Sequence, residues 1–74
     1  MSDTLQNARS LVASALGLEL DEVGSDATIA SLDAWDSLGH MRISAAIEER
    51  IGRPLTGEEV LALASVQGVA AHLA

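Results

Sequence analysis

The fold of this chain is decided by residues 33–51, which read DAWDSLGHMRISAAIEERI and lie near the middle of a sequence of 74 residues. From Ser37 onward the run has no proline, and its apolar side chains recur three and four residues apart, so it predicts an amphipathic helix over residues 37–51. Gly52 and Pro54 follow and are expected to stop this helix. Asp36 is expected to be its N-cap, which makes Ser37 the first helical residue.

The position of Ser37 has two interpretations. The first N–H groups of a helix lack partners within the helix, and the helix dipole places partial positive charge there, so a phosphate bonded to Ser37 would be held favourably. Alternatively, Asp36 and Ser37 only cap the helix, as such pairs do in many proteins.

Outside residues 33–51 the sequence predicts three further helices and no strand. Apolar residues at helical spacing predict a first helix over residues 4–16 that ends at Gly17. Residues 18–32 have no sustained period and are expected to form a long connection. Thr56 and Glu59 form a capping box before a short helix, and Ser65 is expected to cap the last one. The expected fold is all-α, a small four-helix bundle with three main helices, one short helix and a long first loop.

The length and the apolar content limit the interior. A chain of 74 residues is expected to be one domain, residues 1–74, and its hydrophobic content of 49% suffices for one core. Trp35 is the only aromatic residue, so the core is expected to consist of Leu, Ile, Val and Ala, with Ile47 deeply buried. An aliphatic interior of this kind could part to admit a ligand.

The charge of −7 and the absence of cysteine exclude several classes of function. Nucleic acid is an improbable partner because binding phosphates requires a basic face, whereas acidity favours partners with basic surfaces. No thiolate metal site can form, and Asp36 with His40 would offer only two ligands to a metal. No apolar run approaches the roughly 18 residues of a membrane span, so we expect a cytoplasmic monomer without membrane insertion.

An enzymatic interpretation would combine Asp33, Ser37 and His40 as a hydrolase-like triad. Ser37 and His40 lie three residues apart on one helix, with no independent scaffold to orient them, and a chain this short leaves little room for an oxyanion hole. We therefore expect that the chain is not an enzyme. His72 is expected to face solvent.

The sequence resembles the acyl carrier proteins. Asp-Ser-Leu at a helix start near the midpoint of an acidic helical chain is typical of that family, and Ser37 occupies the serine position. Three further stretches match along the chain, namely residues 18–23 after the first helix, residues 27–32 before the motif, and Val66-Gln67 at the start of the last helix. The resemblance covers nearly the whole sequence.

The resemblance implies a carrier function. A phosphopantetheinyl transferase would attach 4'-phosphopantetheine from coenzyme A to Ser37, and the terminal thiol of this arm would carry acyl groups as thioesters to partner enzymes. By this resemblance Asp36 and Leu38 match the family's recognition residues on either side of the serine. The family's partner-facing positions along the central helix are matched by Met41, Ala45, Glu48 and Glu49.

The sequence also departs from carriers of general fatty acid biosynthesis. Gly39, His40 and Arg42 stand where those carriers have acidic residues, and the spacer before Asp36 is one residue longer and includes Trp35. These differences favour a specialised lipid, polyketide or other secondary pathway with a dedicated acyl-activating ligase or acyltransferase, and Arg42 becomes a candidate for partner selection. Peptidyl carriers are also similar, but their usual Gly-Gly-His-Ser-type motif is absent. The alternative is a small acidic helical protein-interaction module in which Ser37 is only a cap.

Overall fold

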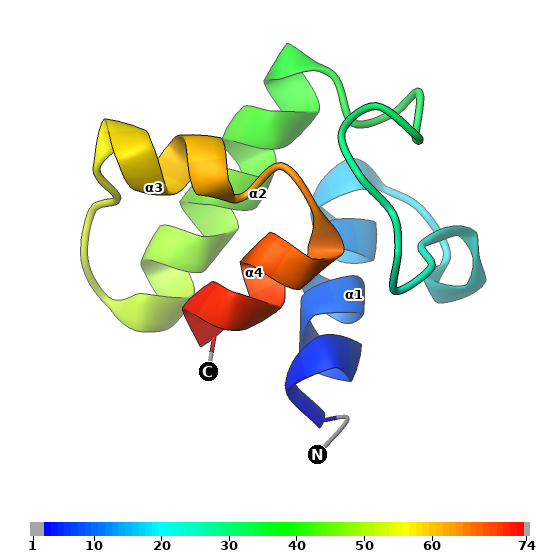
Figure 1. The fold of residues 1–74 in the computed structure, drawn as a ribbon, viewed down its shortest axis with the longest axis horizontal. Coiled ribbons are helices and arrows are strands. Elements are labelled where there is room, and N and C mark those ends of the chain that lie inside the picture. Colours follow the sequence, from blue (N-terminus) through cyan, green and yellow to red (C-terminus); the bar gives the residue numbers. More distant parts are fainter. Residues whose placement is uncertain (1–2, 74) are drawn as a thin grey trace.

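The computed structural model describes residues 3–73, and these residues form a small bundle of helices (Figure 1). The four α-helices pack around one core, and a single turn of 3-10 helix lies in the first connection, as the sequence predicted for an all-α fold. The elements in chain order are α1 (Asp3–Leu16), η1 (Leu20–Glu22), α2 (Ser37–Ile51), α3 (Gly57–Ala62) and α4 (Val66–Leu73).

Two glycines end the long helices where the sequence predicted. Gly17 after α1 has a φ of 72° and Gly52 after α2 has a φ of 77°, a left-handed conformation that glycine adopts without steric cost. Gly52 also donates its N–H to the Glu48 carbonyl at 2.8 Å. The boundaries of α1 and α2 therefore follow from local sequence.

The starts of the two shorter helices are capped by side chains. Thr56 accepts a hydrogen bond from the N–H of Glu59, and the Glu59 carboxylate accepts from the N–H of Thr56, which is the predicted capping box. Ser65 Oγ accepts from the N–H of Gly68 at 3.0 Å and so caps α4. Both predictions are confirmed.

The core lies where α1, α2 and α4 meet, and in Figure 1 α4 crosses beside α1. Ile43 and Ile47 of α2 are completely buried, as predicted for Ile47. They belong to a cluster that every helix or its flanking loop supplies, with Val12 from α1, Leu63 after α3 and Val69 from α4. Burial of these side chains is the main stabilising contribution to so small a fold.

Trp35 corrects the expected composition of this core. Its side chain is only 1% exposed and is the largest of the fully buried ones, so the expectation of a core built only from Leu, Ile, Val and Ala was wrong. The indole can be buried because its N–H finds an acceptor, the Nδ1 of His40, at 2.9 Å.

Arg9 of α1 binds the first part of the long connection through hydrogen bonds. Its Nε donates to the Val23 carbonyl at 2.6 Å and its Nη2 donates to the Leu20 carbonyl at 3.1 Å. Val23 itself is completely buried. The short helix η1 is therefore held against α1 by a charged donor and an apolar anchor together.

The second part of the connection is held by backbone hydrogen bonds to the start of α4 and to the segment just before it. Ile29 donates its N–H to the Ala64 carbonyl at 2.9 Å, and Val66 donates to the Ala27 carbonyl at 3.0 Å. These bonds fix the loop that leads into Trp35 and α2.

No helix among residues 3–73 is long and apolar enough to cross a membrane.

Candidate functional site

Ser37 is the first residue of α2, and its side chain is exposed. The preceding Asp36 is in an extended conformation, and its Oδ1 accepts the N–H of Gly39 at 2.8 Å. The carbonyl of Asp36 accepts the N–H of His40 at 2.8 Å. The N-cap prediction is confirmed, and the hydroxyl of Ser37 stands at the positive end of a helix of 15 residues.

Gly39 has a structural role in the first turn of α2. An added Cβ would lie 2.6 Å from the Ala34 carbonyl oxygen and 2.6 Å from Leu16 Cδ2, closer than carbon atoms approach in folded proteins. The glycine therefore allows α2 to start against the end of α1 and against the loop before it. A larger side chain, such as an acidic one, has no room here.

His40 is held on both sides of its ring. Trp35 Nε1 donates to His40 Nδ1, so the ring proton lies on Nε2, which donates to the Val60 carbonyl of α3 at 2.8 Å. The two rings are also stacked, with centroids 6.3 Å apart and planes inclined by 26°. Since neither ring nitrogen is directed at Ser37, the geometry gives His40 no role as its general base.

An exposed apolar face runs along α2 from the serine. Leu38 is 57% and Met41 is 69% exposed, and Ala45, four residues after Met41, is also exposed. Residues three and four apart share one side of a helix, so these three side chains form a continuous strip. Large exposed apolar side chains close to one another are typical of protein interaction sites.

Leu61 of α3 is a further exposed apolar residue, with a relative exposure of 79%. It directly follows Val60, whose carbonyl binds His40 in the first turn of α2. The sequence did not single out Leu61, because a helix of six residues is too short for periodicity to separate its buried face from its exposed one.

Glu48 and Glu49 differ in their surroundings. The half-buried Glu48 accepts the N–H of Leu55 through its Oε2 at 2.9 Å and so holds the loop between α2 and α3. Glu49 is exposed. Of these two glutamates, Glu49 therefore has the side chain that is more accessible to a partner.

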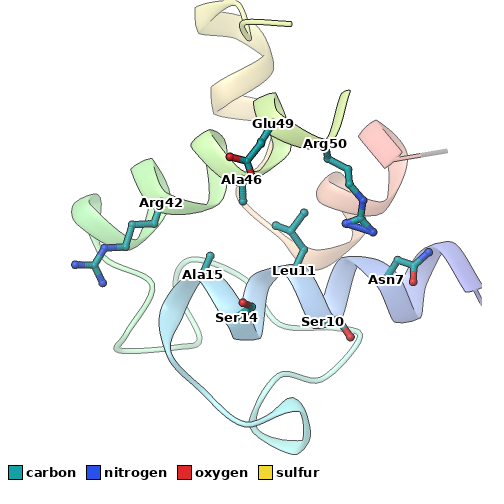
Figure 2. A pocket seen from close by; sticks show the side chains of 9 residues that line it. All are labelled: Asn7, Ser10, Leu11, Ser14, Ala15, Arg42, Ala46, Glu49 and Arg50. Atoms are coloured by element: carbon teal, nitrogen blue, oxygen red, sulfur yellow. The ribbon is translucent and has the colours of Figure 1, made fainter. Parts of the chain in front are cut away.

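A hollow of about 430 Å³ lies between α1 and α2 and is open to solvent (Figure 2). Arg42, Glu49 and Arg50 of α2 lie along one wall, and neither arginine makes an ion pair with any side chain among residues 4–73. Ala46, Asn7, Ser10, Leu11, Ser14 and Ala15 complete the lining. The guanidinium groups of Arg42 and Arg50 extend away from each other at opposite ends of this wall.

An ion pair fixes the start of α3. Arg53 donates to both carboxylate oxygens of Glu59, at 2.9 and 2.7 Å, and these bonds, helped by the backbone hydrogen bond from Thr56, lower the pKa of Glu59 to about 2. His72 Nε2 lies 3.6 Å from the same carboxylate, and the side chain of His72 is only 19% exposed. The expectation that His72 faces solvent was therefore wrong.

Metal binding finds no support in the side-chain geometry. Among residues 3–73 no three His, Asp or Glu side chains are grouped closely enough to hold an ion. The pair considered from sequence, Asp36 and His40, is engaged instead in capping and in the bonds to Trp35 and Val60.

A family model described as "phosphopantetheine attachment site" matches residues 7–73. A search of curated proteins found no significant match. The matched region contains all of α2, α3 and α4 and most of α1. Domains of this family bear covalently attached 4'-phosphopantetheine, act as carriers and are not themselves enzymes, and they work with phosphopantetheinyl transferases and acyl-processing enzymes. The chain belongs to the family of phosphopantetheine-binding carrier proteins.

Proposed function

We propose that Ser37 is the residue to which 4'-phosphopantetheine is attached, and that the chain presents acyl thioesters to the enzymes of a specialised lipid, polyketide or other secondary pathway. The observation that carries this proposal is the exposed hydroxyl of Ser37 at the start of α2, inside the region that matches the family. The flanking Asp36 and Leu38 complete the motif.

The surroundings of Ser37 suit the attachment chemistry. Ser37 Oγ would attack the phosphorus of the pantetheine phosphate in coenzyme A, the bond to the 3',5'-bisphosphorylated adenosine would break, and the transferase would remove the serine proton. The product is a phosphodiester on Ser37, whose negative charge is favoured at the N-terminus of α2. The attached arm supplies a terminal thiol, which this cysteine-free chain lacks.

Partner enzymes would dock on the strip formed by Leu38, Met41 and Ala45, beside Asp36 and Glu49. The strip begins next to Ser37, so an enzyme bound there would have the arm at its surface. The acidic residues around it would steer enzymes with basic surfaces, and the apolar side chains would supply buried area in the complex.

The proposal of a specialised pathway depends on Arg42 more than on the other residues that differ from fatty-acid carriers. Gly39 and His40 have internal roles, in the contact with Leu16 and in the bond to Val60. Arg42 remains on the surface without an ion pair in the described part of the chain and would repel a basic enzyme patch. A dedicated acyl-activating ligase or acyltransferase with a less basic docking surface would accept it.

The proposal includes a single carrier domain over residues 1–74 in the cytoplasm.

The alternative, an interaction module in which Ser37 only caps α2, is not favoured, because the family match extends over nearly the whole chain. The two functions differ in covalent chemistry. Incubation with coenzyme A and a broad-specificity phosphopantetheinyl transferase, followed by intact-mass analysis, should add one phosphopantetheine to each carrier molecule, whereas an interaction module would gain no mass.

A further inference from the structure

The part of the core next to Ser37 is filled by Trp35. This indole lies two residues before the serine and is 1% exposed, in a core whose other members are aliphatic. An alkyl chain entering the bundle from Ser37 would compete with the indole for the same space. Because protein interiors are close-packed, added volume there would have to displace neighbouring side chains.

Hydrogen bonds close the bundle between α2 and α3. Trp35 Nε1 donates to His40 Nδ1 at 2.9 Å, and His40 Nε2 donates to the Val60 carbonyl at 2.8 Å. These bonds join the loop before α2, the first turn of α2 and the body of α3. Separating α3 from α2 to admit a chain would break the second bond, and moving the indole would leave its buried N–H unpaired, which is unfavourable.

Close packing blocks the opposite side, between α2 and α1. Gly39 touches Leu16 and the Ala34 carbonyl so closely that even a methyl group would not fit. Farther along the two helices, the hollow of about 430 Å³ is open to solvent and carries Arg42 and Arg50 on its wall (Figure 2). A chain lying there would stay largely in water beside charged groups, so the hollow is no substitute for a buried site.

We propose that the acyl cargo of this carrier stays outside the helical core, and that its cargo is therefore short or polar, such as aminoacyl or hydroxyacyl groups. The inference rests on the proposed attachment at Ser37. Trp35 and His40 act as specificity-determining residues, since they keep the side of α2 that faces α3 closed to an alkyl chain, and the contact of Gly39 with Leu16 closes the side that faces α1. Methylene groups left in water are unfavourable, so a carrier that does not bury its cargo suits acyl groups with few of them.

The test compares two loaded forms of the wild-type protein. A broad-specificity phosphopantetheinyl transferase would load one sample from coenzyme A and another from octanoyl-coenzyme A, and intact mass would verify each product. Thermal unfolding by far-UV circular dichroism and the fluorescence of Trp35, the only tryptophan, would then be recorded for both. We expect midpoints within about 1 °C of each other and the same emission maximum.

Burial of the octanoyl chain would give a different result. It would raise the midpoint of the octanoyl form by on the order of 10 °C over the form without an acyl group, and would change the surroundings of Trp35 and hence its emission. That outcome would overturn the inference while leaving attachment at Ser37 intact. If neither coenzyme A derivative adds mass, the proposed function fails, and this inference fails with it.

A variant tests whether the indole is what excludes the chain. Trp35→Leu frees space and removes the donor to His40, so its octanoyl form should unfold several degrees above its own unacylated form. Leu61→Ala is the control, because it shortens an exposed side chain on α3 without opening the core, and it should behave as the wild type. A Trp35→Leu protein that gains nothing from octanoylation would contradict the role of Trp35, and the wild-type comparison decides on cargo placement even if this variant does not fold.

Discussion

Gly39 of α2 lies against Leu16 of α1 so closely that a Cβ at residue 39 would come within 2.6 Å of Leu16 Cδ2. This contact sets how α2 begins, and with it the position of Ser37 two residues earlier. The same Cβ would also meet the Ala34 carbonyl oxygen, which belongs to the backbone and cannot turn away. The glycine in the motif is therefore a requirement of packing.

The first prediction follows from this contact. Gly39→Ala should lower the free energy of unfolding by about 1–3 kcal/mol, because the added methyl group overpacks the junction of α1, α2 and the loop. Chemical denaturation of both proteins measures the difference. Gly57→Ala is the matched control, since a Cβ at this first residue of α3 meets nothing within 4 Å and should be neutral or slightly stabilising. Equal effects at the two sites would contradict the tight contact with Leu16.

Ile47 tests the orientation of α2. Its side chain is completely buried at the centre of the core, so Ile47→Ala should cost about 2–5 kcal/mol and could unfold a domain of this size. The free energy of unfolding from urea titration gives the value. Met41→Ala on the exposed strip is the control and should change stability by no more than about 0.5 kcal/mol. A cost below about 1 kcal/mol at Ile47 would mean that α2 presents another side to the core.

The ion pair of Arg53 and Glu59 predicts a change of stability in acid. The folded state lowers the pKa of Glu59 from 4.5 to about 2, chiefly through the hydrogen bond from Arg53, so the folded protein binds the proton more weakly than the unfolded chain does. The resulting stabilisation is present above pH 4.5 and is lost as the pH falls toward 2.

Glu59→Gln removes this titration and leaves His72 in place. Between pH 4.5 and 2 the wild type should therefore lose more stability than the variant, and added salt should reduce the difference because the pair is at the surface. Thermal unfolding of both proteins across this pH range is the measurement. Parallel losses in the two proteins would show that the ion pair contributes nothing to acid sensitivity.

Arg42 tests partner selection. Arg42→Glu should speed acyl transfer by general fatty-acid enzymes with basic docking patches, which the arginine would repel, and should slow loading by the dedicated acylating enzyme that we propose. Transfer rates onto the modified carrier would be measured with both enzymes at low and moderate salt. Arg50→Glu makes the same charge change at the far end of the same wall of the hollow and controls for net charge. An unchanged ratio of the two rates would make Arg42 a solvated charge without a part in selection.

Local signals in the sequence predicted where the helices begin and end. Gly17, Gly52 and the Thr56 and Glu59 pair end or start helices through contacts within a few residues, and such contacts can be inferred from residue type and spacing. The place of Ser37 as the first residue of α2 followed in the same way from the N-cap Asp36 beside it.

Contacts between distant residues could not be predicted in this way. In the sequence Trp35 stood out only as the one aromatic residue, in the spacer before Asp36. Its indole N–H is satisfied by His40, which in turn binds the Val60 carbonyl of α3. His72 of α4 lies 3.6 Å from the carboxylate of Glu59, which stands thirteen positions earlier in α3. Neither pairing leaves a periodic signal, because each depends on how the helices are arranged in space.

Attachment at Ser37 is the central claim, and site-resolved mass analysis tests it most directly. Wild type, Ser37→Ala and Ser14→Ala would be incubated with coenzyme A and a phosphopantetheinyl transferase, with far-UV circular dichroism to verify that each is folded. Ser14 is an exposed helical serine of α1 and serves as the matched control. We predict one phosphopantetheine on wild type and on Ser14→Ala, located on the peptide that contains Ser37, and none on Ser37→Ala. Modification of the folded Ser37→Ala protein, or no modification of the wild type, would contradict the account.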